Sequence, residues 1–565
     1  MRALRPPKVR SRRIAAAAAL VSALTLPGAA GQAPSDEAVA RESRERGIGL
    51  LRKGDAAAAV VELRAAVAHD PADAEAHDHL GVALGELGQG EAAEGAFREA
   101  IRLDPRRAEA HYHLGVVLDR LDRPHQALAA LQSALRHDPA SVHARFGLSV
   151  VLAKLGDLDG TIRLLREVTA AAPEHADARY DLGVHLWTRY RRGRHLRRPA
   201  DLDQAEQELR KAAELDPSRP KFRLGLGQLL VERQRMDEAV EQLRAAVQAA
   251  GGDPAYRYDL GLALRRQGDL DGAEAELRAT VAGNPRHALA RRALGLILRQ
   301  KGDHEAAARE LRLSVTELPG DAEGHNALGT VLLKLSDLPG AVEEFRQATR
   351  LDPTMTEAHV NLAQALARSG KRDDARGSLA EVERLKALDS SLGRAMVLLD
   401  MAAKEAEKGQ PSASVARLRE AVAASPGFAE GHYQLALALR ETGAPHAEVD
   451  EALLSALQFD PGHAPARREW ARQLAARGDA AGALDQLRKV VELQPSVVGA
   501  QRELARLSEA GRDWPSAIAA LQAAAAFEPR DPAIRSDLAR VLSAAGRSAE
   551  AEAERAAAKG LGADR

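Results

Sequence analysis

The sequence predicts an all-α solenoid built from stacked helical hairpins. The first observation is that residues 72–139 contain one segment twice, shifted by 34 positions, so that Leu80-Gly81 returns as Leu114-Gly115. The second is that apolar residues inside each unit recur at spacings of three and four, which is the period of an α-helix. The third is that one position of every unit is small, which indicates close packing between helices.

Residues 1–31 precede the repeat and have the order of a secretory signal peptide. A basic opening without acidic residues is followed by an apolar run over 14–26 and by small residues over 27–31. This order is typical of an export signal, and the apolar run is short for a bilayer span. We expect an exported protein, periplasmic or extracellular, with an uncleaved membrane anchor as the alternative. The pattern does not separate Sec from Tat export.

From about residue 38 a proline or its equivalent marks the end of each unit. These residues are Pro71, Pro105, Pro139, Pro173, Pro217, Gly251, Pro285, Pro319, Pro353, Pro426, Pro461, Pro495 and Pro529. Proline disfavours helix at the residue before it, so each marks the stop of a second helix. With the first and last units included, the register predicts 15 helix pairs between residues 38 and 563.

The turn inside each hairpin also has a signature. It carries glycine in many units, which suits the left-handed conformation that follows a helix. The eighth position of the unit is never larger than serine; it is occupied by Gly47, Gly81, Gly115, Ser149, Gly183, Gly227, Gly261, Gly295, Gly329, Ala363, Ala402, Ala436, Ala471, Ala505 and Ala539. Glycine costs roughly 1 kcal/mol in a helix, so we expect a close helix contact there.

With Leu-Gly at positions seven and eight, alanine at twenty and twenty-seven, a large apolar residue at twenty-four and proline at thirty-two, the units resemble tetratricopeptide repeats. The resemblance covers nearly all of the chain after residue 31. It implies a right-handed superhelix of about 15 helix-turn-helix units, whose first helices line a concave groove that binds peptides or proteins. One departure is position four, often tryptophan in the family, which here is His77, His111, Arg145 or similar.

The register breaks twice. Ten extra residues lie near 189–204 and bring in a basic cluster that includes Arg191, Arg192, Arg194, Arg197 and Arg198. This insertion is read either as a lengthened, solvated turn or as a basic finger for an anionic partner. The second break falls near 386–391 and predicts a joint, so that an N-terminal array over 32–387 is followed by a C-terminal array over 388–565 that ends in a capping helix.

Composition and motifs argue against several functions. Cysteine is absent and the net charge is −1, which excludes thiol chemistry and disfavours a general nucleic-acid binder. No phosphate loop, HExxH, GxSxG or EF-hand motif occurs. The histidine pairs His77/His79 and His111/His113 are interpreted as helix-packing residues rather than metal ligands, because residues two apart on a helix point away from each other. No catalytic residue, metal or cofactor is predicted.

The fifth position of successive units predicts a row of aromatic side chains. It holds Tyr112, Phe146, Tyr180 and Tyr258, with Leu224 interrupting. The resemblance places this position in the groove, where such rings are good anchors. Asp181 and Asp259 occupy the next position and are included in the predicted site. The alternative is that the rings only fill gaps between helices.

The leading hypothesis is therefore a non-enzymatic scaffold of the cell envelope that holds a protein or peptide in its groove. The alternative, from another class, is an accessory factor in polysaccharide or glycan secretion, since exported arrays resembling this one often serve secretion machineries. An enzyme with a separate catalytic domain is disfavoured because the repeats reach the C-terminus. The partner's identity and the oligomeric state are not predicted.

Overall fold

The computed structural model describes residues 35–192 and 199–563, and all regular structure in these ranges is helical. The units before the second register break contain α1 (Asp36–Arg52), α2 (Ala56–His69), α3 (Ala74–Glu86), α4 (Gly90–Leu103), α5 (Ala108–Arg120), α6 (Pro124–His137), α7 (Val142–Lys154), α8 (Leu158–Ala171), α9 (Ala176–Arg192), α10 (Pro199–Leu215), α11 (Pro220–Glu232), α12 (Met236–Ala249), α13 (Pro254–Gln267), α14 (Leu270–Gly283), α15 (Ala288–Lys301), α16 (His304–Glu317), α17 (Ala322–Lys334), α18 (Leu338–Leu351) and α19 (Thr356–Arg368). The remaining helices are α20 (Arg372–Glu407), α21 (Pro411–Ala424), α22 (Ala429–Glu441), α23 (His446–Phe459), α24 (Ala464–Ala476), α25 (Ala480–Leu493), α26 (Val498–Ala510), α27 (Trp514–Phe527), α28 (Pro532–Ala544) and α29 (Ser548–Ala563).

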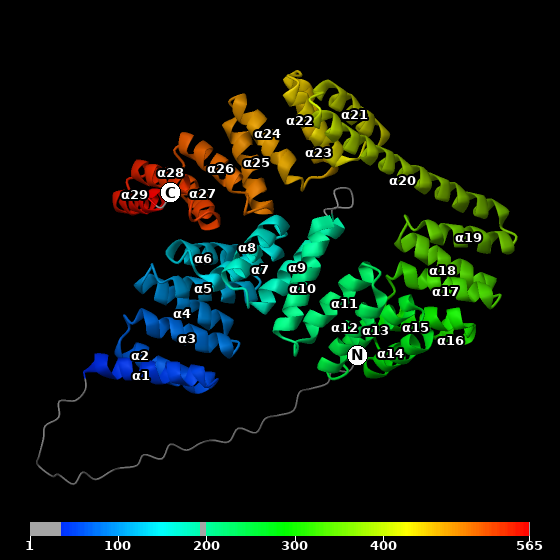
Figure 1. Ribbon diagram of the computed structural model, residues 1–565, viewed down its shortest axis with the longest axis horizontal. Helices are drawn as coiled ribbons and strands as arrows, with labels where there is room; N and C mark the ends of the chain where they lie inside the picture. The colour runs from blue at the N-terminus through cyan, green and yellow to red at the C-terminus, as the bar shows by residue number, and fades with distance from the viewer. Residues whose placement is uncertain (1–34, 193–198, 564–565) are drawn as a thin grey trace, which may run out of the picture.

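Consecutive helices form hairpins, and each hairpin packs on the next, which confirms the predicted solenoid. Figure 1 shows the path: the units from α1 to α19 advance across the molecule, the long helix α20 turns the chain back, and α21 to α29 return toward the first units. The C-terminal helices then lie beside α6 to α8, and α27 contacts α6 directly.

The small eighth position is explained by the side chain at position twenty-four of the same unit. A Cβ added at Gly81 would lie 2.5 Å from Phe97 Cε1, and one added at Gly115 would lie 2.5 Å from Leu131 Cγ. Phe97 and Leu131 are each 1% exposed. The first helix therefore packs its backbone against a large buried side chain of the second helix, as the sequence predicted.

The turns inside the hairpins use the left-handed conformation at the predicted glycines, for example Gly54 at φ 78° and Gly268 at φ 97°. Where the glycine is missing, another residue takes that conformation; Asp122 does so at φ 56°. Second helices commonly begin at an aspartate cap, as in α14, where Asp269 accepts a hydrogen bond from the Gly272 backbone N–H.

The first register break lengthens two helices. Helix α9 has 17 residues where α7 has 13, and α10 has 17 where α8 has 14. The connection between them occupies 193–198, so Arg194, Arg197 and Arg198 of the predicted basic insertion lie outside the described residues. Most of the extra sequence thus extends the hairpin.

The second register break is a continuous helix. Helix α20 has 36 residues and serves as second helix of one unit and first helix of the next. No proline or glycine occurs between Gly377 and Gly393, so nothing stops the helix where other units end. The predicted joint near 386–391 lies inside α20 and is helical; the division into two arrays at 387/388 stays a prediction. This fusion leaves 29 described helices rather than 30.

In the last helix, α29, Ala551 is the one buried side chain among residues 548–561, in agreement with a capping role. In the described part of the chain no helix is both long and apolar enough to cross a bilayer. The predicted signal peptide over 1–31 lies outside the described residues.

Candidate binding groove

The aromatic row, defined as Tyr112, Phe146, Tyr180 and Tyr258, lies on the first helices α5, α7, α9 and α13. All four side chains are half-buried. Their rings pack against hydrophobic core residues of their own and neighbouring units. Burial raises the pKa of each of the three tyrosines. Each ring is thus held by its surroundings while part of it remains open to solvent.

The rings are fitted into the gap between consecutive first helices. The Tyr180 and Phe222 ring centroids are 5.2 Å apart. A Cβ added at Gly225, on the next first helix, would lie 2.8 Å from Tyr180 Cε2. Tyr258 lies in the same way against His287, at 4.9 Å between centroids. Part of each ring therefore fills the gap between helices, as the alternative interpretation expected. Contact between the exposed part of each ring and a ligand stays a prediction.

Asp181 follows Tyr180 on α9 and lines a hollow of about 370 Å³ formed with α7 and α8. Burial raises the pKa of the Asp181 carboxyl to about 6; Lys221 opposes the rise and Asp177 adds to it. Among the described residues, no cationic side chain lies within ion-pairing distance of this carboxylate. Burial likewise raises the pKa of Asp259, although its carboxylate accepts a 2.9 Å hydrogen bond from Gln228 Nε2.

Lys221, whose charge lowers the pKa of Asp181, forms its ion pair with a different carboxylate. Lys221 Nζ lies 2.6 Å from an Asp177 carboxylate oxygen and 5.2 Å from the centre of the Tyr180 ring. Arg219 also pairs with Asp177, at 2.7 Å. The surface around Tyr180 thus combines a half-exposed ring, two cations that are paired with Asp177, and the Asp181 carboxyl group, which has no ion-pair partner among the described residues.

Position four has a structural role that the sequence did not reveal. Its side chain hydrogen-bonds the backbone carbonyl six residues earlier, in the turn that ends the previous unit, as His111 Nε2 does to Pro105 O at 3.0 Å. The same bond is made by His77, Arg145, Arg179, Arg291, His325, His359, His432, Arg467 and Gln501. Arg257 instead bonds the carbonyl five residues earlier, Gly252 O. Several of these side chains also reach the second helix, as Arg291 does to Glu310 at 2.6 Å.

The other two histidines of the pairs are also hydrogen-bonded. His79 Nδ1 lies 2.9 Å from Glu75 O, and His113 Nδ1 lies 2.8 Å from Asp78 Oδ1. Asp78 is 1% exposed and also pairs with Arg107. Burial acts to raise the pKa of Asp78, but the bonds from His113 and Arg107 outweigh it and lower that pKa. No group of three or more potential metal ligands occurs in the part of the chain that is described.

Two of the described arginines beside the insertion contact other side chains of the protein. Arg189 forms a bidentate pair with Asp201 at 2.8 Å and a further pair with Asp159. Arg191 lies over the Trp187 ring and 4.0 Å from Glu232. Arg191 and Arg192 are exposed at the end of α9. Binding of an anionic partner or glycan by this insertion remains a prediction.

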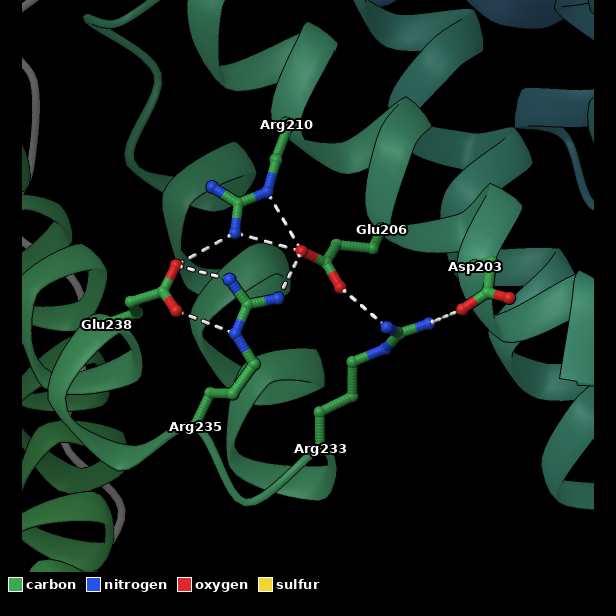
Figure 2. A network of polar contacts seen from close by, with 6 residues as sticks. All are labelled: Asp203, Glu206, Arg210, Arg233, Arg235 and Glu238. Atoms are coloured by element: carbon green, nitrogen blue, oxygen red, sulfur yellow. Dashed lines mark hydrogen bonds and ion pairs between the residues drawn. The ribbon is translucent and has the colours of Figure 1, made fainter.

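Figure 2 shows the network that anchors the lengthened helix α10 to the turn between α11 and α12. Glu206, 8% exposed, accepts contacts from Arg210, Arg233 and Arg235 at 2.7–3.0 Å. Glu238 and Asp203 complete the set, so that three guanidinium groups face three carboxylates. Charge-assisted bonds of this kind are the stronger class of hydrogen bond. The insertion is therefore fixed at its base.

Two further features were not predicted. Tyr433 on α22 also occupies the fifth position and packs against His463 at 4.9 Å between ring centroids. A hollow of about 320 Å³ lies between α20, α21 and α22, with Met396, Leu399 and Leu418 among its lining. Tyr433 could have been found by continuing the row past the second register break.

Comparison with known proteins gives one family. A model described as tetratricopeptide repeat matches residues 44–105, 80–124, 258–322, 326–390, 399–464 and 468–532, and a second model of that description matches 120–182 and 197–260. No curated protein matches the chain.

Solved structures that are similar to the chain include MamA from Desulfovibrio magneticus RS-1, at 24% identity over 30% of this chain and 94% of that one, with a TM-score of 0.28. YrrB, a TPR protein with an unusual peptide-binding site, is 21% identical over 34% of this chain and 95% of its own, with a TM-score of 0.28. The APC/C hetero-tetramer Cut9–Hcn1 is 13% identical over 83% and 96%, with a TM-score of 0.35.

Proposed function

This chain belongs to the tetratricopeptide repeat family, and from that premise we propose that it is a non-enzymatic scaffold that binds a protein or peptide segment along its first helices. Stacked repeats present an extended surface for their mass, which suits binding of a long partner. The observation that carries the proposal is the aromatic row, whose rings are pre-positioned by packing and still partly open to solvent.

The chemistry of the wall favours a partner with apolar and basic side chains. A ring that is already immobilised loses little rotamer freedom on binding. Asp181 has no ion-pair partner among the described residues, and burial raises its pKa to about 6. A lysine or arginine of the partner would supply the missing cation, stabilise the ionised carboxylate and lower that pKa.

We further propose that the scaffold works in the cell envelope. The support is the order of residues in 1–31, namely a basic region, a short apolar run and small residues. Cell fractionation and N-terminal sequencing test this directly. A protein recovered from the periplasm or medium with an N-terminus near residue 32 is expected; a cytosolic protein that retains residue 1 would contradict export.

The binding proposal is tested by site-specific photocrosslinking and capture. A photoreactive phenylalanine analogue at Tyr180 is expected to crosslink the partner, and the analogue at Arg98, an exposed residue on the second helix α4, is not. The triple change Tyr112→Ala, Tyr180→Ala and Tyr258→Ala is expected to abolish capture and leave helicity unchanged by circular dichroism. Tyr433→Ala, at the same repeat position beyond α20, tests whether the binding surface continues past the second register break. Retention of the same partners by the triple variant would exclude the aromatic row as the binding surface.

A further inference from the structure

The C-terminal units meet the outer side of units near the N-terminus, more than 300 residues earlier in the chain. We call this contact the seam; it joins α6 and α8 to the turn before α26, to α27 and to the start of α28 (Figure 1). It is formed by second helices, by inter-unit turns and by the start of the first helix α28, so it does not follow from the repeat, in which each unit packs on its sequence neighbours.

At the centre of the seam is a shared carboxylate. Asp157 caps α8 by accepting a hydrogen bond from the Gly160 N–H through Oδ1, and through Oδ2 it accepts one from the Ser496 backbone N–H at 2.8 Å. Asp157 is 2% exposed and Ser496 is 6% exposed. The approach depends on glycine, because a Cβ at Gly160 would lie 2.4 Å from Ser496 Oγ and 2.6 Å from Ser496 Cβ.

A second set of contacts lies beside this carboxylate. Arg163 donates a 3.2 Å hydrogen bond to Ser496 O, and its guanidinium lies 5.7 Å from the centre of the Phe527 ring. Phe527, 2% exposed, belongs to the same apolar core as Leu135 and Leu164 of the early units. The seam therefore has a fitted polar centre and a buried aromatic anchor.

The seam also buries charge that it does not fully satisfy. Arg163 Nε and Arg535 Nε are buried without a hydrogen-bond partner, and buried unsatisfied donors oppose association. Burial lowers the pKa of Arg136, which faces both Glu554 and Arg535 across the contact. A cleft of about 980 Å³, lined from both sides by residues such as Arg145, Glu167, Glu528 and Arg530, remains open in the seam.

From these contacts we propose that the seam is a reversible latch, in which the C-terminal units are the specific intramolecular partner of α6 and α8. Its specificity comes from Asp157, Gly160 and Arg163, and its reversibility from the incompletely compensated charges. Because each hairpin keeps its neighbours when the seam parts, opening changes the spread of the superhelix without unfolding a unit. The units held from outside are those that carry Tyr112 and Phe146 on their first helices, so the latch and the aromatic row share the same hairpins.

Distance measurement by pulsed electron paramagnetic resonance tests the latch. The chain has no cysteine, so Ala129→Cys on α6 and Ala519→Cys on α27, both exposed, give a full-length protein with two labelling sites across the seam. A second pair, Ala57→Cys on α2 with Ala129→Cys, reports on the N-terminal units alone. The parent protein is expected to give a narrow, short distance for the seam pair.

Two variants with matched controls then open the latch. Gly160→Leu is expected to move much of the seam-pair distribution to longer distances. Its control is Gly272→Leu, at the same place after a capping aspartate, where the three atoms nearest to an added Cβ all belong to Asp269. Arg163→Ala is expected to act in the same direction more weakly, with Arg166→Ala as control on an exposed position of α8.

Circular dichroism and the α2–α6 distance are expected to stay unchanged in all four variants. Three results would overturn the latch: a broad, long seam distance in the parent protein, equal behaviour of Gly160→Leu and Gly272→Leu, or seam opening that occurs only together with a loss of helicity. The last result would make the seam an integral part of the fold rather than a latch.

Discussion

The units that carry the aromatic row and the three terminal units place different chemistry at the same repeat positions. In the former, the fifth position holds a ring such as Tyr180 that lies against Gly225 at the sixth position of the next unit. In the latter, fifth-position Arg468 and Arg502 pair with Glu503 and Asp537, the sixth-position residues of the next units. One backbone therefore supports two kinds of wall, one with partly open rings and one whose charges neutralise each other.

The eighth position differs in parallel. Up to Gly329 it is glycine, apart from Ser149, and from Ala363 onward it is alanine. At Gly115 even a methyl group would come within 2.5 Å of Leu131, whereas the methyl group of Ala505 is already accommodated and 2% exposed. The early hairpins are thus the more tightly closed ones, and the comparison can be tested at each of these positions.

The largest effect is expected at the eighth position. Gly115→Leu should lower the free energy of unfolding by about 1–3 kcal/mol through overpacking against Leu131. Ala505→Leu should cost less, because its first carbon already has a place beside the partner helix. Thermal denaturation followed by circular dichroism measures both. Equal losses of free energy of unfolding in the two variants would show that the two helices pack equally closely in the early and in the late hairpins.

A smaller, pH-dependent effect is expected at Asp181. Because its pKa is raised from 3.8 to about 6, its contribution to stability is present below pH 4 and is lost as the pH rises through 6. Asp181→Asn removes this loss, so the variant should be more stable than the parent by about 1–2 kcal/mol at pH 8, after allowance for solvent screening. At pH 4 the two should melt together.

The matched control is Asp537→Asn, at the sixth position of a terminal unit, where Arg502 holds the carboxylate at 2.8 Å. This change removes an ion pair and should not stabilise the protein at pH 8. If Asp181→Asn lowers the melting temperature at pH 8, the Asp181 carboxylate has a counter-charge and the contrast between the two walls fails there.

The smallest effect on stability is expected in the terminal units, where charged side chains at the fifth and sixth positions pair with each other. Arg468→Ala should cost less than about 1 kcal/mol, because Glu503 keeps Arg472 at 2.6 Å and exposed pairs contribute little. Glu503→Ala should cost more, since it leaves Arg468 and Arg472 side by side without their anion. A series of melting curves at low and high salt distinguishes the two, and the difference should shrink as salt screens the charges.

What the sequence predicted well is local or periodic. The 34-residue period, the stops at residues such as Pro105 and the left-handed turn at Gly54 each depend on the conformation of one or two residues. The continuous helix α20 was not predicted: the register shift near 386–391 predicts a joint, whereas the structure has unbroken helix in that segment, which contains no proline or glycine.

The features that the sequence did not reveal depend on which side chains and backbone groups meet in the folded structure. The bond from position four to the turn before it could not be recognised, because histidine, arginine and glutamine share only the ability to reach one carbonyl, as His111 does to Pro105. The contact of Asp157 with Ser496 depends on how small rotations between hairpins accumulate over many units. The predicted groove residues, such as Tyr180 and Asp181, lie on the first helices as expected, and what they bind stays a prediction.

Helix α20 has a mechanical consequence. With 36 residues it forms a strut about 54 Å long, and near its middle Leu388 is 56% exposed. The C-terminal units are therefore connected to the earlier units in two places: through the continuous helix α20 and through the contact of Ser496 with Asp157. While both connections hold, the spacing between the C-terminal and the earlier units is fixed. If the seam opened, the C-terminal units would stay attached only through α20 and could move relative to the earlier units as one rigid arm.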